Sequence, residues 1–112
     1  RMLFRFCWFR HWKTDIFYNQ FPFFSEGAAQ YLVEQGLQVL ALDTPSPDDG
    51  SAIGKMDDSP VHKILLKNNV TIIEYLTHTD LLDTAKRYNL FALPLKLKDC
   101  DGAPSRIIMV EV

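Results

Sequence analysis

Four consecutive apolar residues, Val39–Leu42, occupy the middle of the chain. A strand that is apolar on both faces must be covered on both faces, which is typical of parallel sheets flanked by helices. A helix is predicted just before this run, because Ser25 is a favourable N-cap and Gly36 is placed to end the helix in a left-handed turn. A helix followed by a buried strand indicates an α/β fold.

The rest of the sequence extends this arrangement. A second helix is predicted from Ser59 as N-cap, with Pro60 at its first position, to Asn68 or Asn69. Strands are predicted at residues 1–6, 70–74, 90–97 and 106–112, a loop at 43–59, a short helix at 80–88, and a turn at 101–102. A chain of 112 residues, 47% of them hydrophobic, can bury one core. We therefore expect a mixed β-sheet with a few packed helices.

Several classes of protein are disfavoured by composition. Twelve Lys and Arg residues against 14 Asp and Glu give a net charge of -2, which argues against nucleic acid as a partner. No apolar run approaches the roughly 18 residues of a membrane span, and Arg5, Arg10 and Lys13 interrupt any signal-peptide pattern. Cys7 and Cys100 are widely separated, so we expect reduced, buried thiols in a cytoplasmic protein.

Aromatic residues are concentrated near the start of the chain. Ten of the fourteen (eight Phe, four Tyr and two Trp in all) lie within residues 4–24, without a helical or strand period. We interpret this stretch as a long connection packed by its own rings, which needs cover from water. Because strand-like alternation begins directly after Arg1, we expect a piece of a longer protein that associates through residues 4–24.

His62 and Glu74 are the residues most suited to chemistry. A helix rises about 9 Å over the six residues after His62. A strand then returns about 10 to 13 Å, so the two side chains can end up side by side. Imidazole and carboxylate groups are common ligands of zinc and manganese. Taken alone, the pair is more typical of a capping or solvated histidine and a surface glutamate than of a metal site.

Four groups of residues, in order along the chain, resemble the cyclase family of metal-dependent hydrolases, which includes bacterial kynurenine formamidases and isatin hydrolases. Asp43-Thr44-Pro45-Ser46-Pro47-Asp48 is similar to the family's D-T-x-S-x-D loop. His62-Lys63-Ile64-Leu65-Leu66 followed by Ile72-Ile73-Glu74-Tyr75-Leu76-Thr77 resembles its H-[RK]-x-L-L and I-x-E-N-L-T segments. Leu93-Pro94-Leu95-Lys96 and Asp101-Gly102-Ala103-Pro104-Ser105-Arg106 resemble its A-L-P-L-K and D-G-S-P-x-R elements.

This resemblance implies a fold, a site and an activity. The fold would be the family's swivelling β/α type, incomplete at its N-terminal side, with residues 1–112 forming the C-terminal portion of a single domain. His62 and Glu74 match the family's metal ligands, twelve residues apart, so a divalent metal, zinc or manganese, is implied. The implied activity is hydrolysis of an amide or lactam C–N bond in a small aromatic substrate. The metal would activate a water molecule and polarise the carbonyl.

The chain also departs from the family. The family's H-x-G-T-H-x-D-x-P-x-H segment, which carries the other ligands and the catalytic histidine, has no match, since the histidines are His11, His62 and His78. We therefore expect no catalytic residue here, an inactive isolated segment, and a partner that is a missing N-terminal half or a second copy. The alternatives are an inactive binding or assembly subunit and an unrelated α/β binding module.

Further residues are expected around the site. Trp8 and Trp12 lie where the family has an aromatic-rich stretch, and they are interpreted as pocket residues or as ordinary packing residues. Asp43, Ser46 and Asp48 are expected to shape the rim, with a structural hydrogen-bonding role preferred for Asp43. Tyr75 and His78 stand where the family has asparagines, and a surface position is preferred for His78 over a ligand role.

Overall fold

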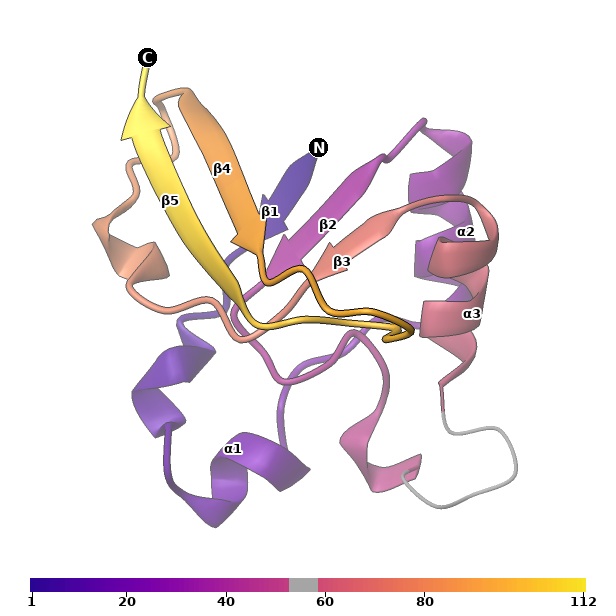
Figure 1. Ribbon diagram of the computed structural model, residues 1–112. Helices are drawn as coiled ribbons and strands as arrows, with labels where there is room; N and C mark the ends of the chain where they lie inside the picture. Colours follow the sequence, from indigo (N-terminus) through magenta and orange to yellow (C-terminus); the bar gives the residue numbers. More distant parts are fainter. Residues whose placement is uncertain (53–58) are drawn as a thin grey trace. The chain divides into compact units, whose positions relative to one another are not determined.

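The computed structural model describes residues 1–52 and 59–112, so residues 53–58 of the predicted loop lie outside the described part. The chain divides into two compact units, Arg1–Asp80 and Leu81–Val112. The first unit contains a parallel sheet with helices, and the second contains an antiparallel pair of strands (Figure 1). The predicted α/β class is confirmed, with parallel and antiparallel pairing in two separate sheets.

The sheet of the first unit has three parallel strands in the order β1 (Met2–Phe4), β2 (Val39–Leu42), β3 (Thr71–Ile73). Leu40 in the central strand lies opposite Met2 on one side and Ile72 on the other. Leu40, Ala41 and Leu42 are at most 1% exposed, as predicted for a strand covered on both faces.

Two helices, α2 (Glu26–Glu34) and α3 (Pro60–Lys67), pack side by side next to this sheet (Figure 1). They share one apolar core with β2, and its buried members are Ala29, Leu32, Leu37, Leu40, Leu42, Val61, Leu65 and Val70. The ends of α2 are as predicted. The Ser25 hydroxyl accepts a hydrogen bond from the Ala28 amide at 3.2 Å, and Gly36 follows the helix with a φ of 78°.

The aromatic stretch contains two short helices that the sequence did not predict, a 3-10 turn η1 (Trp8–His11) and α1 (Asp15–Asn19). Its rings pack on one another around Phe17, which is 1% exposed and meets Trp12 and Tyr18 edge-on at 5.0 Å. A further 3-10 turn, η2 (Gly50–Ala52), follows the loop after β2. Packing within residues 4–24 agrees with the predicted self-packed connection.

The second unit is a hairpin of β4 (Tyr88–Pro94) and β5 (Ser105–Glu111), with Leu90 opposite Met109. The helix predicted at residues 80–88 is wrong, because only a 3-10 turn, η3 (Thr79–Leu81), forms near it. Within the unit, Asp83 accepts a hydrogen bond from the Ala85 amide at 2.9 Å. Such side-chain bonds compete with helix formation.

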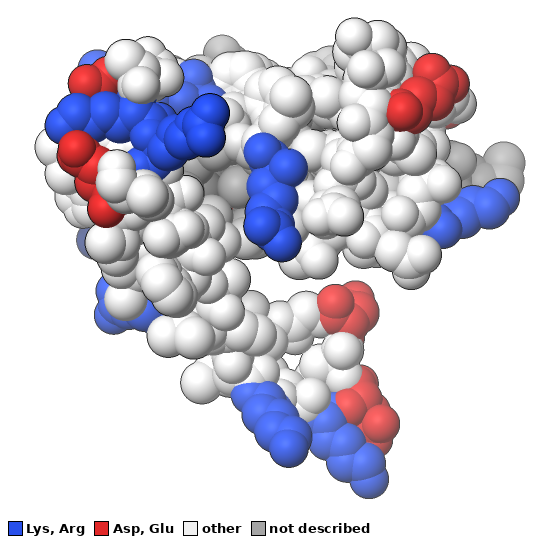
Figure 2. Space-filling model, turned by 90° about the horizontal axis from the view of Figure 1, so that it is seen from above, with Lys and Arg blue, Asp and Glu red and all other residues white. Residues whose placement is uncertain are grey.

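Three surface properties complete the description. The cysteines are free, but the prediction that both are buried is wrong, since Cys7 is partly exposed and Cys100 fully exposed. On the face that Figure 2 shows, Lys and Arg occur as small separate groups interspersed with Asp and Glu. Among residues 1–52 and 59–112, no helix has the length and apolar character needed to cross a bilayer.

Candidate metal centre

The site lies at the carboxyl ends of β2 and β3, an edge at which parallel sheets commonly bind ligands. The segments that follow β2 and β3 remain hydrogen-bonded to each other beyond the strands. The Tyr75 amide donates to the Thr44 carbonyl at 3.1 Å, and the Leu76 amide donates to the Leu42 carbonyl at 3.2 Å. Glu74 is therefore held beside the loop that follows β2. The first turn of α3, which carries His62, begins at the same edge.

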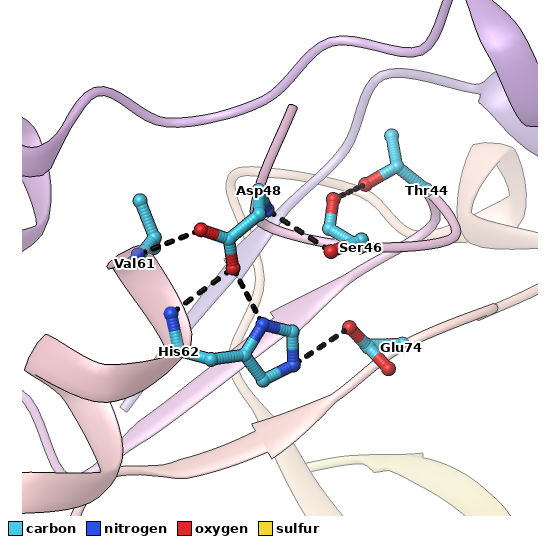
Figure 3. A network of polar contacts seen from close by, with 6 residues as sticks. All are labelled: Thr44, Ser46, Asp48, Val61, His62 and Glu74. Carbon is cyan, nitrogen blue, oxygen red and sulfur yellow. Dashed lines mark hydrogen bonds and ion pairs between the residues drawn. The ribbon is translucent and has the colours of Figure 1, made fainter. Parts of the chain in front are cut away.

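His62 and Glu74 meet at this edge. The Nε2 atom of His62 lies 3.4 Å from Oε1 of Glu74 (Figure 3). Their side chains are 29% and 27% exposed, so both are largely enclosed but still reachable. The prediction that helix and strand bring these two residues together, made from their spacing in the sequence, is confirmed.

Asp48 occupies the other side of the His62 ring. Its Oδ2 lies 2.5 Å from Nδ1 of His62 and accepts the His62 backbone N–H at 3.0 Å, while Oδ1 accepts the Val61 N–H at 2.7 Å. These are N–H groups of the first turn of α3, which need acceptors from outside the helix. Asp48 therefore caps α3. Ser59 occupies the N-cap position and Pro60 begins the helix, as predicted, although the Ser59 side chain makes no capping bond.

The two carboxylates change the acidity of His62. The side-chain contact with Glu74, followed by the hydrogen bond with Asp48 and the negative charges of both carboxylates, raises the pKa of His62 to about 9, although burial opposes the shift. Burial and the charge of Glu74 also raise the pKa of Tyr75. Without a metal, His62 is thus protonated at neutral pH and paired with two anions.

The residues present fit a divalent metal. Two ligands about 2.1 Å from one tetrahedral ion lie about 3.4 Å apart, which matches the separation of Nε2 and Oε1. Oε1 of Glu74 is buried and has no hydrogen-bond partner within the described residues, so an acceptor is available for a cation. No group of three or more His, Cys, Asp or Glu side chains suited to a metal occurs in the described ranges. The described residues thus bring two candidate ligands together, His62 and Glu74.

Asp43 and Ser46 have mainly internal partners. Asp43 is fully buried, and its carboxylate accepts hydrogen bonds from the Phe6 and Cys7 amides and the Thr79 hydroxyl at 2.6 to 3.0 Å. These contacts match the structural role preferred for Asp43. The Ser46 hydroxyl accepts the Asp48 N–H at 3.0 Å and so fixes the loop (Figure 3).

The two tryptophans differ in position. Trp8 donates its ring N–H to the Phe17 carbonyl at 3.1 Å, and this bond ties the aromatic stretch together. Trp12 is 50% exposed, and its ring meets that of Tyr75 edge-on at 6.2 Å. Since Tyr75 follows Glu74 directly, Trp12 lies near the candidate ligands.

Sequence reasoning missed two features of the site. It treated Tyr75 as a departure from a motif, although its position after a strand-end ligand could have marked it as a site residue. It also placed Asp48 at the rim of the site. In the structure Asp48 is only 3% exposed and contacts the His62 ring. His78 is exposed and contacts the Phe9 ring at a centroid distance of 6.0 Å, in line with the preferred surface position.

Comparison with known proteins shows consistent relatives. The Cyclase family model matches residues 2–49. The kynurenine formamidase of Bordetella petrii is 32% identical over 91% of this chain and 46% of its own length, and that of Bacillus mycoides is 32% identical over 88% and 44%. This chain therefore spans slightly less than half the length of these curated relatives.

Solved structures agree with the sequence relatives. A potential metal-dependent hydrolase with cyclase activity matches with a TM-score of 0.66 and 32% identity, over 80% of this chain and 41% of its own. An isatin hydrolase bound to the product analogue thioisatinate matches with a TM-score of 0.79 and 25% identity, over 98% of this chain and 45% of its own. The family model, the sequence relatives and these solved structures agree with one another, and together they support the similarity of this chain to the cyclase family.

Proposed function

We propose that this chain contributes His62 and Glu74 to the divalent metal site, zinc or manganese, of a hydrolase. The reaction is cleavage of an amide or lactam C–N bond in a small aromatic substrate, as the names kynurenine formamidase and isatin hydrolase suggest for its relatives. The observation that carries the proposal is the 3.4 Å separation of Nε2 and Oε1, with Oε1 lacking a hydrogen-bond partner within the described residues.

Each residue has a defined task in this proposal. His62 and Glu74 hold the metal, which supplies an activated water and a Lewis acid for the substrate carbonyl. Trp12 and Tyr75 offer exposed ring surface beside the ligands, suited to stacking against an aryl group. We propose that Trp8, Asp43 and Ser46 support the site indirectly. Their polar atoms form hydrogen bonds within the chain and so hold the surrounding segments in place.

The remaining ligands would come from a partner, which we propose to be a missing half of the domain or a second copy of the chain. Metal sites that catalyse hydrolysis use three or more protein ligands, and the part of the chain that the structure describes brings two together. Exposed rings within residues 4–24, those of Phe6 and Phe23 among them, are the proposed contact. The free cysteines suit the cytoplasm as the location.

A second candidate is an inactive cyclase-like subunit that binds or assembles without hydrolysis. One observation favours it: only two candidate ligands are brought together in the described ranges. Under this alternative His62 and Glu74 would form only a structural ion pair.

Zinc binding and hydrolysis of N-formylkynurenine separate the two candidates. The purified chain should bind zinc in calorimetry, His62→Ala and Glu74→Gln should each lose this binding, and the exposed His78→Ala should retain it. Turnover by the chain alone should not exceed that of free metal. Adding a chain that carries the H-x-G-T-H-x-D segment should give turnover that His62→Ala abolishes. Zinc binding unchanged in both ligand variants would refute the metal role, and no turnover with the added chain would favour the inactive subunit.

A further inference from the structure

The two ring nitrogens of His62 face two carboxylates at different distances. Nδ1 lies 2.5 Å from Oδ2 of Asp48, whereas Nε2 lies 3.4 Å from Oε1 of Glu74. The first separation is that of a strong charge-assisted hydrogen bond, and the second is long for any hydrogen bond. When the ring carries a single proton, the two nitrogens therefore compete for it unequally.

A carboxylate can only accept hydrogen bonds, so the nitrogen beside Asp48 must be the donor. We propose that Asp48 is a positioning residue, which keeps the proton of the neutral His62 ring on Nδ1 and leaves the Nε2 lone pair directed at Glu74. The use of that lone pair to bind a metal rests on the proposed function. The position of the proton does not depend on it.

Asp48 is itself held in place, as a positioning residue must be. Its side chain is 4% exposed, and Oδ1 is bonded to the Val61 N–H at 2.7 Å. Its own N–H donates to the Ser46 hydroxyl at 3.0 Å, and the Thr44 hydroxyl donates to the Ser46 carbonyl at 3.1 Å. Figure 3 shows this series of bonds running from the loop after β2 to the His62 ring. The ring orientation is therefore fixed from the sheet edge.

This arrangement has a chemical consequence for a metal site. Metal-binding histidines commonly donate their second N–H to a carboxylate, which fixes the ring and makes the binding nitrogen more basic. Asp48 supplies that carboxylate from a residue 14 positions before His62, while the same group caps α3. A metal arriving between Nε2 and Glu74 would find the ring already oriented.

Nitrogen-15 NMR of the metal-free chain tests the proton position directly. When the His62 ring carries a single proton, its two nitrogens have distinct nitrogen-15 shifts, which show the nitrogen that holds the proton. We expect the proton on Nδ1 of His62, because Nδ1 lies beside the Asp48 carboxylate. In Asp48→Asn the amide can donate to Nδ1 while its oxygen keeps the Val61 bond, so the proton should move to Nε2.

A proton on Nε2 of His62 in the unmodified chain would overturn the proposal. If Asp48→Asn does not fold, the spectrum of the unmodified chain decides the question alone. This measurement contains no metal, so its outcome is independent of whether the proposed metal role holds.

Zinc affinity, measured by competition with a coloured chelator, tests the consequence for the metal. Asp48→Asn should bind zinc about 10- to 100-fold more weakly. The control is Ser25→Ala, which removes the cap of α2 without touching His62, and which should leave zinc affinity unchanged. Equal affinity in Asp48→Asn and the unmodified chain would overturn the positioning role.

Discussion

At His62, the contacts that stabilise the fold oppose the metal binding proposed above. In the metal-free chain the protonated ring lies between Asp48 and Glu74, and both contacts favour the charged form. Metal binding requires the neutral form. The contacts of the protonated ring with Asp48 and Glu74 would therefore be partly lost on metal binding.

The raised pKa of His62 predicts how the metal-free chain responds to pH. A group whose folded pKa exceeds its ordinary value of 6.5 stabilises the fold fully below pH 6.5, and this stabilisation is lost as the pH rises through about 9. With a chelator present, the thermal midpoint should therefore fall between these values. The control is His62→Gln, in which the fall should be smaller, and an equal fall in both proteins would contradict the prediction.

At the scale of elements, the loop after β2 is packed tightly against the aromatic stretch. A Cβ added at Gly50 would lie 2.6 Å from the ring of Phe21, which is only 6% exposed. A Cβ added at Gly27, near the start of α2, would have no atom within 4 Å apart from the neighbouring backbone of its own helix. The two glycines form a matched pair for testing this packing.

Gly50→Ala should destabilise the fold by about 1 to 3 kcal/mol through overpacking. Gly27→Ala should stabilise it by about 0.5 to 1 kcal/mol, because alanine favours the helix. Urea unfolding followed by circular dichroism gives both free energies of unfolding. A neutral Gly50→Ala would show that Phe21 can move aside and that the loop is less tightly packed than the structure indicates.

The elements themselves differ in how far the sequence could predict them. The α2 helix and the β2 strand follow from local signals, namely the Ser25 cap, the Gly36 turn and a continuous apolar run. The meeting of His62 and Glu74 could also be predicted, because it depends on helix rise and strand length within one short segment. The capping of α3 by Asp48 could not be predicted. Asp48 precedes His62 by 14 residues, and the sequence does not determine the path of the loop between them.

At the scale of the whole chain, exposed apolar side chains predict self-association. Within residues 4–24, Trp12 and Phe23 are each 50% exposed, and in the hairpin Phe91 is 49% exposed beside its partner Ile108 at 46%. A two-stranded hairpin has little stability of its own in water. We expect light scattering to give a mass above that of one chain that rises with concentration.

Single substitutions identify the surface that associates. Phe23→Ser should lower the mass if residues 4–24 form the contact, as proposed, and Phe91→Ser should not. A mass that falls only with Phe91→Ser would place the contact on the hairpin. A constant mass of one chain at high micromolar concentration would contradict association by either surface.

The buried Asp43 has a consequence for how the first unit comes apart. Its carboxylate follows the central strand β2 and accepts hydrogen bonds from Phe6 and Cys7, just beyond β1, and from Thr79, beyond β3. If any one of these segments moved away, the fully buried Asp43 carboxylate would lose a hydrogen-bond donor, which is costly. The Asp43 carboxylate thus holds the ends of all three strands together through hydrogen bonds. We therefore expect this edge of the sheet to open as one unit, after segments elsewhere have frayed.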